Sequence, residues 1–221
     1  LGSGRSESVR AIFGADRVSG GTVHMDGKAV RIHSPKQAMK HGIGYLPEDR
    51  KIDGLFLSKT IEDNIISGNL RHAAPRGYIQ KSLITKAAEA AREKLHIVTP
   101  SVKRDAIDLS GGNQQKVVIG KCVMANAKIF MMDEPSRGID VGAKTDIFIL
   151  MRRFAAQGNG VIFVGSELKE IISVCDRVLV MSNGKLTADL TGDEITEDAL
   201  VIASAANLHT GKAAKSEGSA T

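Results

Sequence analysis

This sequence predicts an α/β fold with a mainly parallel sheet, and three observations support that prediction. Apolar segments with strand character, at 42–46, 129–132 and 160–164, alternate with segments of helical periodicity. This alternation is typical of strand–helix units that build a parallel sheet. Asp-Gly at 26–27 and Asn-Gly at 183–184 separate short apolar stretches, which predicts two antiparallel hairpins. A chain of 221 residues, 42% of them hydrophobic, is long enough to bury a full core.

The composition narrows the classes of function. The formal net charge is only +5 and no long basic run is present, so we do not expect a nucleic-acid partner. No segment has the roughly 18 consecutive apolar residues of a membrane helix, and no signal peptide is visible. The six histidines lack metal-ligand spacing, which argues against a zinc site. Cys122 and Cys175 lie in apolar segments and are expected to be reduced core residues of a cytosolic protein.

The N-terminal segment predicts a turn that opens a helix at 9–13. Such a turn leaves backbone N–H groups free to bind phosphate. Glu7 has two interpretations, an outward-facing residue at the start of the helix or an inward carboxylate that would repel phosphate, and we favour the first. The turn consists of Gly2, Ser3, Gly4, Arg5, Ser6 and Glu7.

The next elements follow from short local patterns. A hairpin is expected at 22–32, and Ser34-Pro35 predicts the start of a short helix. A strand at 42–46 is followed by a charged loop. Thr60 and Asp63 resemble a capping pair ahead of a helix, and strong helix formers predict a second helix at 82–95.

The segment 109–140 carries the chemistry. Ser110-Gly111-Gly112 opens a helix and predicts an anion site made by backbone N–H groups. The apolar run before Asp133 and Glu134 reads as a buried strand with two carboxylates at its end. One carboxylate suits a magnesium ion and the next suits the orientation or deprotonation of a water molecule.

After residue 140, predicted helices and strands alternate as in the preceding part of the chain. Apolar residues recur on one face of a helix that ends near Gly158, and a strand at 160–164 places Ser166 at its end. No Gly-x-Ser-x-Gly motif surrounds Ser166, so we do not expect a hydrolase triad. A helix at 168–175, the second hairpin and a short helix at 197–206 complete the domain, and 207–221 is expected to be a disordered tail.

The order and spacing of these motifs resemble the ATP-binding cassette (ABC) ATPases over nearly the whole chain. The run 109–116 is similar to the family signature, 132–135 to the end of its Walker B strand, and 137–140 to its D-loop. The resemblance implies a P-loop NTPase fold of the ABC type. It also implies one nucleotide-binding domain at 1–206, with a helical subdomain inserted at about 60–107.

The resemblance also implies the site and its cofactors, ATP and Mg²⁺. The P-loop at 2–7 is altered, because Arg5 replaces the usual Lys. Ser166 replaces a His that contacts the γ-phosphate, and Pro47 replaces a Gln, for which Glu48 either substitutes or is a solvated loop charge. The implied catalytic residues are Glu134 and Ser166, and the implied metal ligands are Ser6 and Asp133. The implied nucleotide-binding residues are Gly2, Ser3, Gly4, Arg5, Ser6, Glu7, Ser110, Gly111, Gly112 and Asp140.

Finer features, including Asn113 and the runs 45–51 and 137–144, resemble the second, C-terminal cassette of bacterial ribose, galactose and xylose importers. This implies peripheral attachment to the cytoplasmic face of the inner membrane. The implied partners are a second cassette in the N-terminal half of the same protein, membrane permease subunits and, indirectly, a periplasmic sugar-binding protein. The chain starts within the P-loop, so we expect an N-terminally truncated, poorly stable piece that is inactive alone. Two alternatives are a soluble ABC ATPase without a transporter and a catalytically inactive structural cassette.

Overall fold

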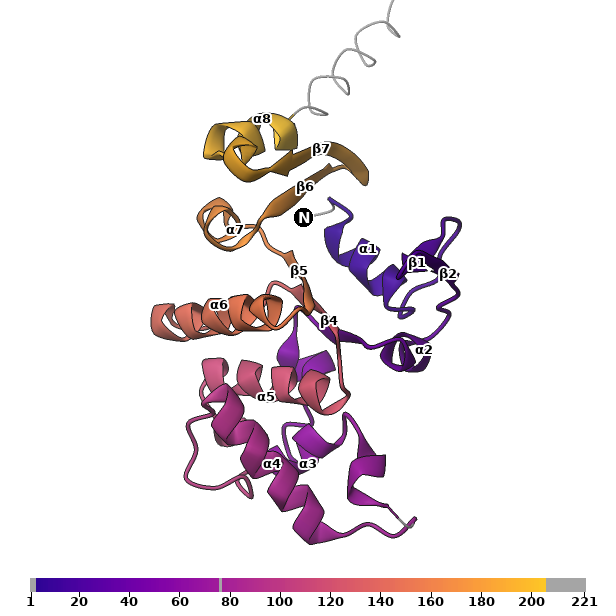
Figure 1. The fold of residues 1–221 in the computed structure, drawn as a ribbon. Coiled ribbons are helices and arrows are strands. Elements are labelled where there is room, and N and C mark those ends of the chain that lie inside the picture. The colour runs from indigo at the N-terminus through magenta and orange to yellow at the C-terminus, as the bar shows by residue number, and fades with distance from the viewer. Residues whose placement is uncertain (1–2, 76, 206–221) are drawn as a thin grey trace, which may run out of the picture. The chain divides into compact units, whose positions relative to one another are not determined.

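A computed structural model describes residues 3–75 and 77–205, and the chain divides into two compact units (Figure 1). The larger unit contains residues 10–164. The smaller unit contains the residues before 10 and those from 165 onward. The predicted phosphate contact of Gly2 and the predicted tail at 207–221 lie outside the described residues.

The larger unit contains a parallel sheet of three strands in the order β3-β4-β5. The carboxyl ends of the parallel strands lie at one edge of the sheet. There Leu46 of β3 pairs with Met132 of β4, and Asp133 of β4 pairs with Val164 of β5. Ligands of open α/β sheets bind at this carboxyl edge. The strands are β3 (Ile43–Leu46), β4 (Ile129–Asp133) and β5 (Gly160–Val164).

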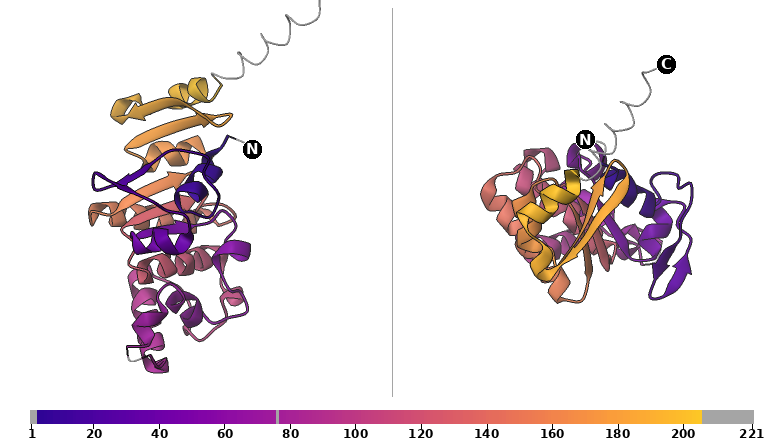
Figure 2. Two further views of the ribbon diagram at one scale, coloured as in Figure 1. Left: turned by 90° about the vertical axis from the view of Figure 1, so that its right-hand side faces the viewer. Right: turned by 90° about the horizontal axis from the view of Figure 1, so that it is seen from above.

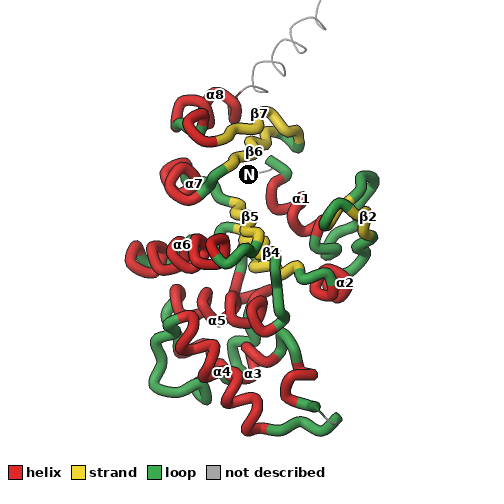
Figure 3. Tube along the Cα trace, viewed as in Figure 1, coloured by secondary structure: helices red, strands yellow, loops and turns green. Residues whose placement is uncertain are grey.

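Helices and one hairpin complete the larger unit (Figure 3). The hairpin joins β1 (Val23–Met25) to β2 (Lys28–Val30) across the predicted Asp-Gly turn. Helices α3, α4 and α5 pack against one another. The helices are α2 (Pro35–Lys40), α3 (Ile61–Ile66), α4 (Lys81–Leu95), α5 (Gly111–Met124) and α6 (Val141–Ala156), with 3-10 turns at Leu70–Ala73 and Ala106–Asp108 and a π-helical turn, η1, at Arg50–Gly54.

The apolar periodicity of α6 predicts its buried face correctly. Ile147, Leu150, Met151 and Phe154 are all buried. The ring of Phe154 stacks on that of Phe130 in β4, with the centroids 4.5 Å apart. This contact fixes α6 against the central strand, and that strand carries Asp133 at its end.

The smaller unit is a hairpin covered by helices. Figure 2 shows the ribbon of the chain in two further views. Helix α8 packs on β6 and β7. The buried core between the helix and the hairpin is formed by Val178, Val180, Leu200 and Ala203. Helix α1 (Arg5–Ile12) begins in this unit and continues into the larger one. The other elements are α7 (Leu168–Val174), β6 (Arg177–Ser182), β7 (Lys185–Thr191), a 3-10 turn at Gly192–Glu194 and α8 (Glu197–Ala205).

Both cysteines are free, as expected, although their environments differ. Cys122 is buried in α5, and burial raises the pKa of its thiol to about 12. Cys175 is half-buried at the end of α7, and desolvation raises its pKa to about 11. Within the described residues, none of the helices combines the length and apolarity needed to cross a bilayer. The π-helical turn η1 was not predicted, because no local sequence pattern identifies such turns.

Candidate functional site

The turn before α5 has an exposed hydroxyl and two backbone N–H groups without an acceptor in the described part of the chain. Ser110 is the N-cap, and its exposed side chain accepts a hydrogen bond from the Asn113 side chain at 3.0 Å. The N–H groups of Gly111 and Gly112 have no acceptor within the described residues. Because the N-terminus of a helix also carries positive partial charge, this turn can bind an anion.

Close packing explains both glycines of this turn. A Cβ on Gly112 would lie 2.4 Å from the Cβ of Ala143 in α6. A Cβ on Gly111 would lie 2.7 Å from Nη2 of Arg50 and 3.0 Å from the carbonyl oxygen of Gly138. No larger residue fits at either position without displacing a neighbour. The first two residues of α5 therefore carry no side chain that could cover their backbone N–H groups.

Asn113 fixes the turn to the segment before it. Its Oδ1 accepts a hydrogen bond from the N–H of Val98 at 2.8 Å, while its Nδ2 donates to Ser110. The amide therefore uses both of its ends and orients the Ser110 hydroxyl. Behind it, the buried Lys116 donates to the carboxylate of Asp146 at 2.7 Å and to the carbonyl of His96.

The carboxylates at the end of β4 lie in different environments. Asp133 is buried, and the hydroxyl of Tyr45 in β3 donates to its Oδ2 at 3.1 Å. Burial, and next the nearby Asp133 carboxylate, raise the pKa of Tyr45, which therefore remains a hydrogen-bond donor at neutral pH. No local pattern in the sequence predicts this contact, because the pairing of β3 with β4 creates it.

Glu134 has a left-handed backbone, with φ at 44°. A non-glycine residue held in this region stores about 1–3 kcal/mol of strain, and such residues cluster at functional sites. The strain is sustained by hydrogen bonds on both sides: its N–H donates to Val164 at 2.8 Å and its carbonyl accepts from Arg137 at 3.0 Å. The side chain remains partly accessible at the end of the strand.

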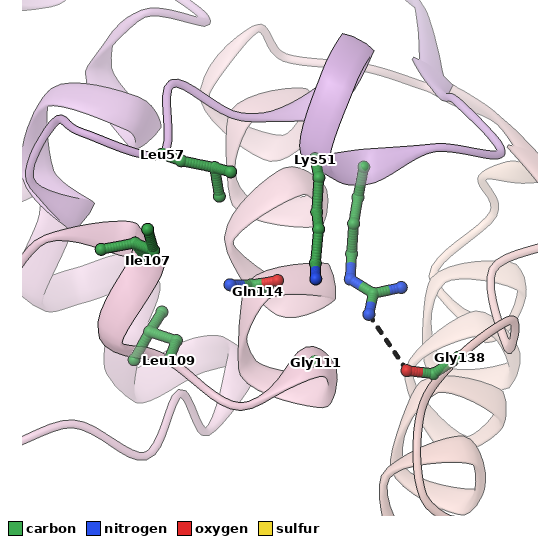
Figure 4. Close-up of a pocket in the computed structure, with 8 residues that line it drawn as sticks. Lys51, Leu57, Ile107, Leu109, Gly111, Gln114 and Gly138 are labelled. Carbon is green, nitrogen blue, oxygen red and sulfur yellow. Dashed lines mark hydrogen bonds between the residues drawn. The ribbon is translucent and has the colours of Figure 1, made fainter.

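Arg50 brings three motifs of the larger unit together. It projects from the π-helical turn η1, and its guanidinium donates to the carbonyls of Arg137 and Gly138, close to Gly111. It also lines a pocket of about 340 Å³. Figure 4 shows Gly111 and Gly138 among the residues around this pocket. The other lining residues are Lys51, Leu57, Ile107, Leu109, Gly111, Gln114 and Gly138. Two buried atoms of this pocket, Nε of Arg50 and Oε1 of Gln114, have no hydrogen-bond partner in the part of the chain that the structure describes.

Two predicted site residues have structural contacts. The carboxylate of Asp140 caps α6 by accepting a hydrogen bond from Ala143 N–H at 2.9 Å. The exposed carboxylate of Glu48 forms an ion pair with Arg137. The exposure of Glu48 is compatible with a solvated loop charge, and its role as a substitute for the amide stays a prediction.

The P-loop-like turn lies in the smaller unit. Gly4 has φ of 87°, and a Cβ there would lie 3.1 Å from the Cα of Gly184, so glycine is required on two grounds. Arg5 donates from Nε to the Ser3 hydroxyl at 2.9 Å and from Nη1 to the carbonyl of Gly165. Glu7 is exposed, in agreement with the outward-facing interpretation.

Ser6 opens α1 in this same unit, and Ser166 is exposed next to the residue that Arg5 contacts. Glu134 and Asp133 belong to the larger unit. In the described ranges, no three His, Cys, Asp or Glu side chains lie together as a metal site. A magnesium ion that takes most of its ligands from phosphate and water does not require such a cluster.

Comparisons with known proteins identify the fold. The chain has the fold of a nucleotide-free ATP-binding cassette, with a TM-score of 0.72 at 24% identity over 90% of this chain and 80% of that one. It also matches the ADP conformation of the cassette MJ1267, with a TM-score of 0.74 at 24% identity over 95% and 84% of the two chains.

Curated relatives are more similar in sequence. A ribose import ATP-binding protein of Rubrobacter xylanophilus is 44% identical over 91% of this chain and 40% of its own length. A putative ribose/galactose/methyl galactoside import ATP-binding protein of Burkholderia cenocepacia is 46% identical over 91% and 39%. The chain thus spans about two fifths of the length of these relatives. Residues 1–137 match the ABC transporter family model, and the chain belongs to the ABC transporter family as an ATP-binding domain.

Proposed function

We propose that this chain is a cassette that couples ATP binding and hydrolysis to the import of a monosaccharide across the bacterial inner membrane. It would act with a second cassette, in the other half of one longer protein, on the cytoplasmic face of permease subunits. A periplasmic sugar-binding protein would deliver the sugar. Sequence identity of 44–46% to ribose and galactose import proteins supports a monosaccharide as the substrate. In this proposal residues 1–206 form one domain, with the helical subdomain at about 60–107.

One observation carries the proposal, the uncovered anion site at the start of α5. Ser110 is exposed, and the N–H groups of Gly111 and Gly112 have no acceptor in the described chain. We propose that these three residues contact the γ-phosphate of an ATP molecule held by the second cassette. Charge develops on that phosphate during transfer, so backbone donors directed at it stabilise the transition state.

The carboxylates at the end of β4 would serve this cassette's own nucleotide. Glu134 would orient or deprotonate the attacking water. Asp133 suits magnesium, because its carboxylate is buried and already oriented by the hydroxyl of Tyr45. When bound, magnesium neutralises phosphate charge.

The nucleotide bound by this chain's own P-loop would be hydrolysed slowly. Arg5 donates its hydrogen bonds within the protein, to Ser3 and Gly165, whereas a P-loop lysine would donate to phosphate. Ser166 has a hydroxyl but no ring that can carry a positive charge. Ser3, Gly4 and Glu7 would line the phosphate turn, and Asp140 would support the adjoining D-loop.

Transport assays on the full-length protein with its permease test the proposal. We expect Ser110→Arg to abolish ATP-driven uptake, because a long cation would fill the anion site. The control is Ser58→Arg, at another exposed serine of the larger unit, which should transport normally. Glu134→Gln should lower steady-state ATPase less than the equivalent change in the other cassette. Equal losses from these two substitutions would contradict the asymmetry.

Two further measurements separate the alternatives. Co-purification with ribosomes in place of membrane permease subunits would favour a soluble ABC ATPase. ATP binding is then measured on the full-length protein with the second cassette's P-loop disabled. Binding there supports a nucleotide site in this chain, whereas its absence would favour the structural cassette.

A further inference from the structure

The guanidinium of Arg50 is committed to the segment 137–138. Its Nη1 donates to the Arg137 carbonyl at 2.8 Å, and its Nη2 donates to the Gly138 carbonyl at 3.1 Å. Its Nε is buried without a partner among the described residues. A planar fork of donors can hold two neighbouring carbonyls at once, which a lysine ammonium cannot do with the same geometry.

The π-helical turn fixes the position from which Arg50 projects. Asp49 caps this turn by accepting hydrogen bonds from the N–H groups of Lys51 at 2.8 Å and Ile52 at 3.1 Å. Gly54 closes it, where a Cβ would lie 3.1 Å from Val118 of α5. Lys121 of α5 donates to the Gly54 carbonyl. The loop 48–54 is therefore attached to the same helix whose first residues form the anion site.

A second connection runs between the same two segments in the opposite direction. Arg137 forms an ion pair with Glu48, while Arg50 donates to the carbonyl of Arg137. The ion pair is exposed, so we expect it to contribute little by itself. Arg50 is half-buried and donates two hydrogen bonds from one planar group, so we expect it to form the stronger connection.

The guanidinium also borders the anion site. The position of a Cβ on Gly111 would be 2.7 Å from Nη2 of Arg50 and 3.0 Å from the carbonyl of Gly138. Arg50, the segment 137–138 and the first residue of α5 therefore form one packed group. A displacement of any one of them changes the surroundings of the other two.

We propose that Arg50 is a positioning residue that holds segment 137–140 against the start of α5, so that the anion site forms correctly only while loop 48–54 is seated. The inference rests on the proposed function, in which the anion site completes the ATP site of a second cassette. Arg50 acts through the backbone of its neighbours and does not itself contact nucleotide.

The test compares three variants of the full-length protein assembled with its permease: Arg50→Gln, Arg50→Lys and the control Arg104→Gln. Arg104 is a matched control, because it is an exposed arginine of the same unit in a surface ion pair with Asp108. Backbone hydrogen exchange is measured without nucleotide on peptides covering 109–115 and 134–143. ATPase activity is measured on the same samples, as is the melting temperature.

We expect Arg50→Gln to speed exchange in both peptides about tenfold, as the loss of two hydrogen bonds implies. It should lower kcat by a similar factor, leave the KM for ATP within about twofold and lower the melting temperature by only a few degrees. Arg50→Lys should restore only part of both effects, and Arg104→Gln should change neither.

Unchanged exchange in Arg50→Gln would overturn the positioning role, whatever the activity. Faster exchange with normal kcat would overturn its link to catalysis. If Ser110→Arg retains full ATPase in the same assembly, the proposed function itself fails. The exchange data still report separately whether Arg50 holds the segment. If Arg50→Gln melts early, Arg50→Lys is used in its place: faster exchange in both peptides than in the unsubstituted protein is still expected, and unchanged exchange would overturn the positioning role.

Discussion

The turn before α5 and the turn before α1 have similar sequences and different surroundings. Each has a serine and glycine at the start of a helix. At α5 the arginine that approaches the turn, Arg50, comes from another loop, and the N–H groups of Gly111 and Gly112 have no acceptor among the described residues. At α1 the arginine is the first residue of the helix itself, and Arg5 donates to the internal oxygens of Ser3 and Gly165.

The difference indicates why a motif can keep its shape and lose part of its chemistry. Both turns require glycine, Gly112 because of Ala143 and Gly4 because of its positive φ and the nearby Gly184. Both turns therefore keep the glycine that their backbone conformation and packing require. The side chain that would face phosphate differs, because Arg5 uses its donors inside the protein.

The largest expected effect tests the packing at α5. Gly112→Ala should destabilise the protein by about 1–3 kcal/mol, because the new methyl group overlaps the Cβ of Ala143. Adding Ala143→Gly removes that overlap and should recover part of the loss. Urea denaturation of the four proteins in this double-mutant cycle measures the coupling. Gly20→Ala is the control, since open space surrounds Gly20. Additive effects would refute the close contact.

Gly4→Ala is expected to have the next largest effect. Its positive φ should cost about 1–2 kcal/mol in an L-residue, and the new methyl group would press on the backbone of Gly184. Proteolysis should become faster near residues 1–9 and 183–184 while cleavage within α5 stays unchanged. This result would show that the loss of stability is confined to the smaller unit. An unchanged denaturation midpoint would contradict the left-handed backbone at Gly4.

Arg5→Lys tests the comparison directly. Lysine cannot reproduce the two bonds to Ser3 and Gly165, so its ammonium becomes available to phosphate. We expect ATP to bind about threefold to tenfold more tightly, or roughly 1 kcal/mol, when the second cassette's P-loop is disabled. Titration with a fluorescent ATP analogue measures this, with Arg17→Lys as the control at an exposed arginine. Weaker binding would show that Arg5 itself serves the nucleotide.

The smallest expected effect concerns the two thiols. Burial raises the pKa of Cys122 from its ordinary 9.0 to about 12, so the native state holds this proton more tightly than the unfolded state. The resulting stabilisation is complete below about pH 9 and is lost as the pH rises toward 12. In Cys122→Ala the free energy of unfolding should therefore decrease less steeply between pH 9 and pH 12. Iodoacetamide at pH 8 should label Cys175 before Cys122, and the reverse order would contradict the burial of α5.

Local patterns in the sequence predicted most of the elements. The turns at 26–27 and 183–184 specify their hairpins through residues that tolerate positive φ, and both hairpins are confirmed. The apolar residues of α6 specify which face is buried, because helical period alone places them together. The motif order was enough to predict the ABC family and the P-loop NTPase fold, which the comparisons confirm.

The tertiary structure alone decided what the site residues contact. Arg50 and Gly138 are far apart along the chain, and neither local propensity nor periodicity reports that a π-helical turn directs one toward the other. The contact of Tyr45 with Asp133 depends on the pairing of β3 with β4. The sequence by itself determined most of the secondary structure and the family, because those depend on short-range preferences and on motif order. Hydrogen-bond partners at long sequence separation depend on packing, and only the folded chain specifies them.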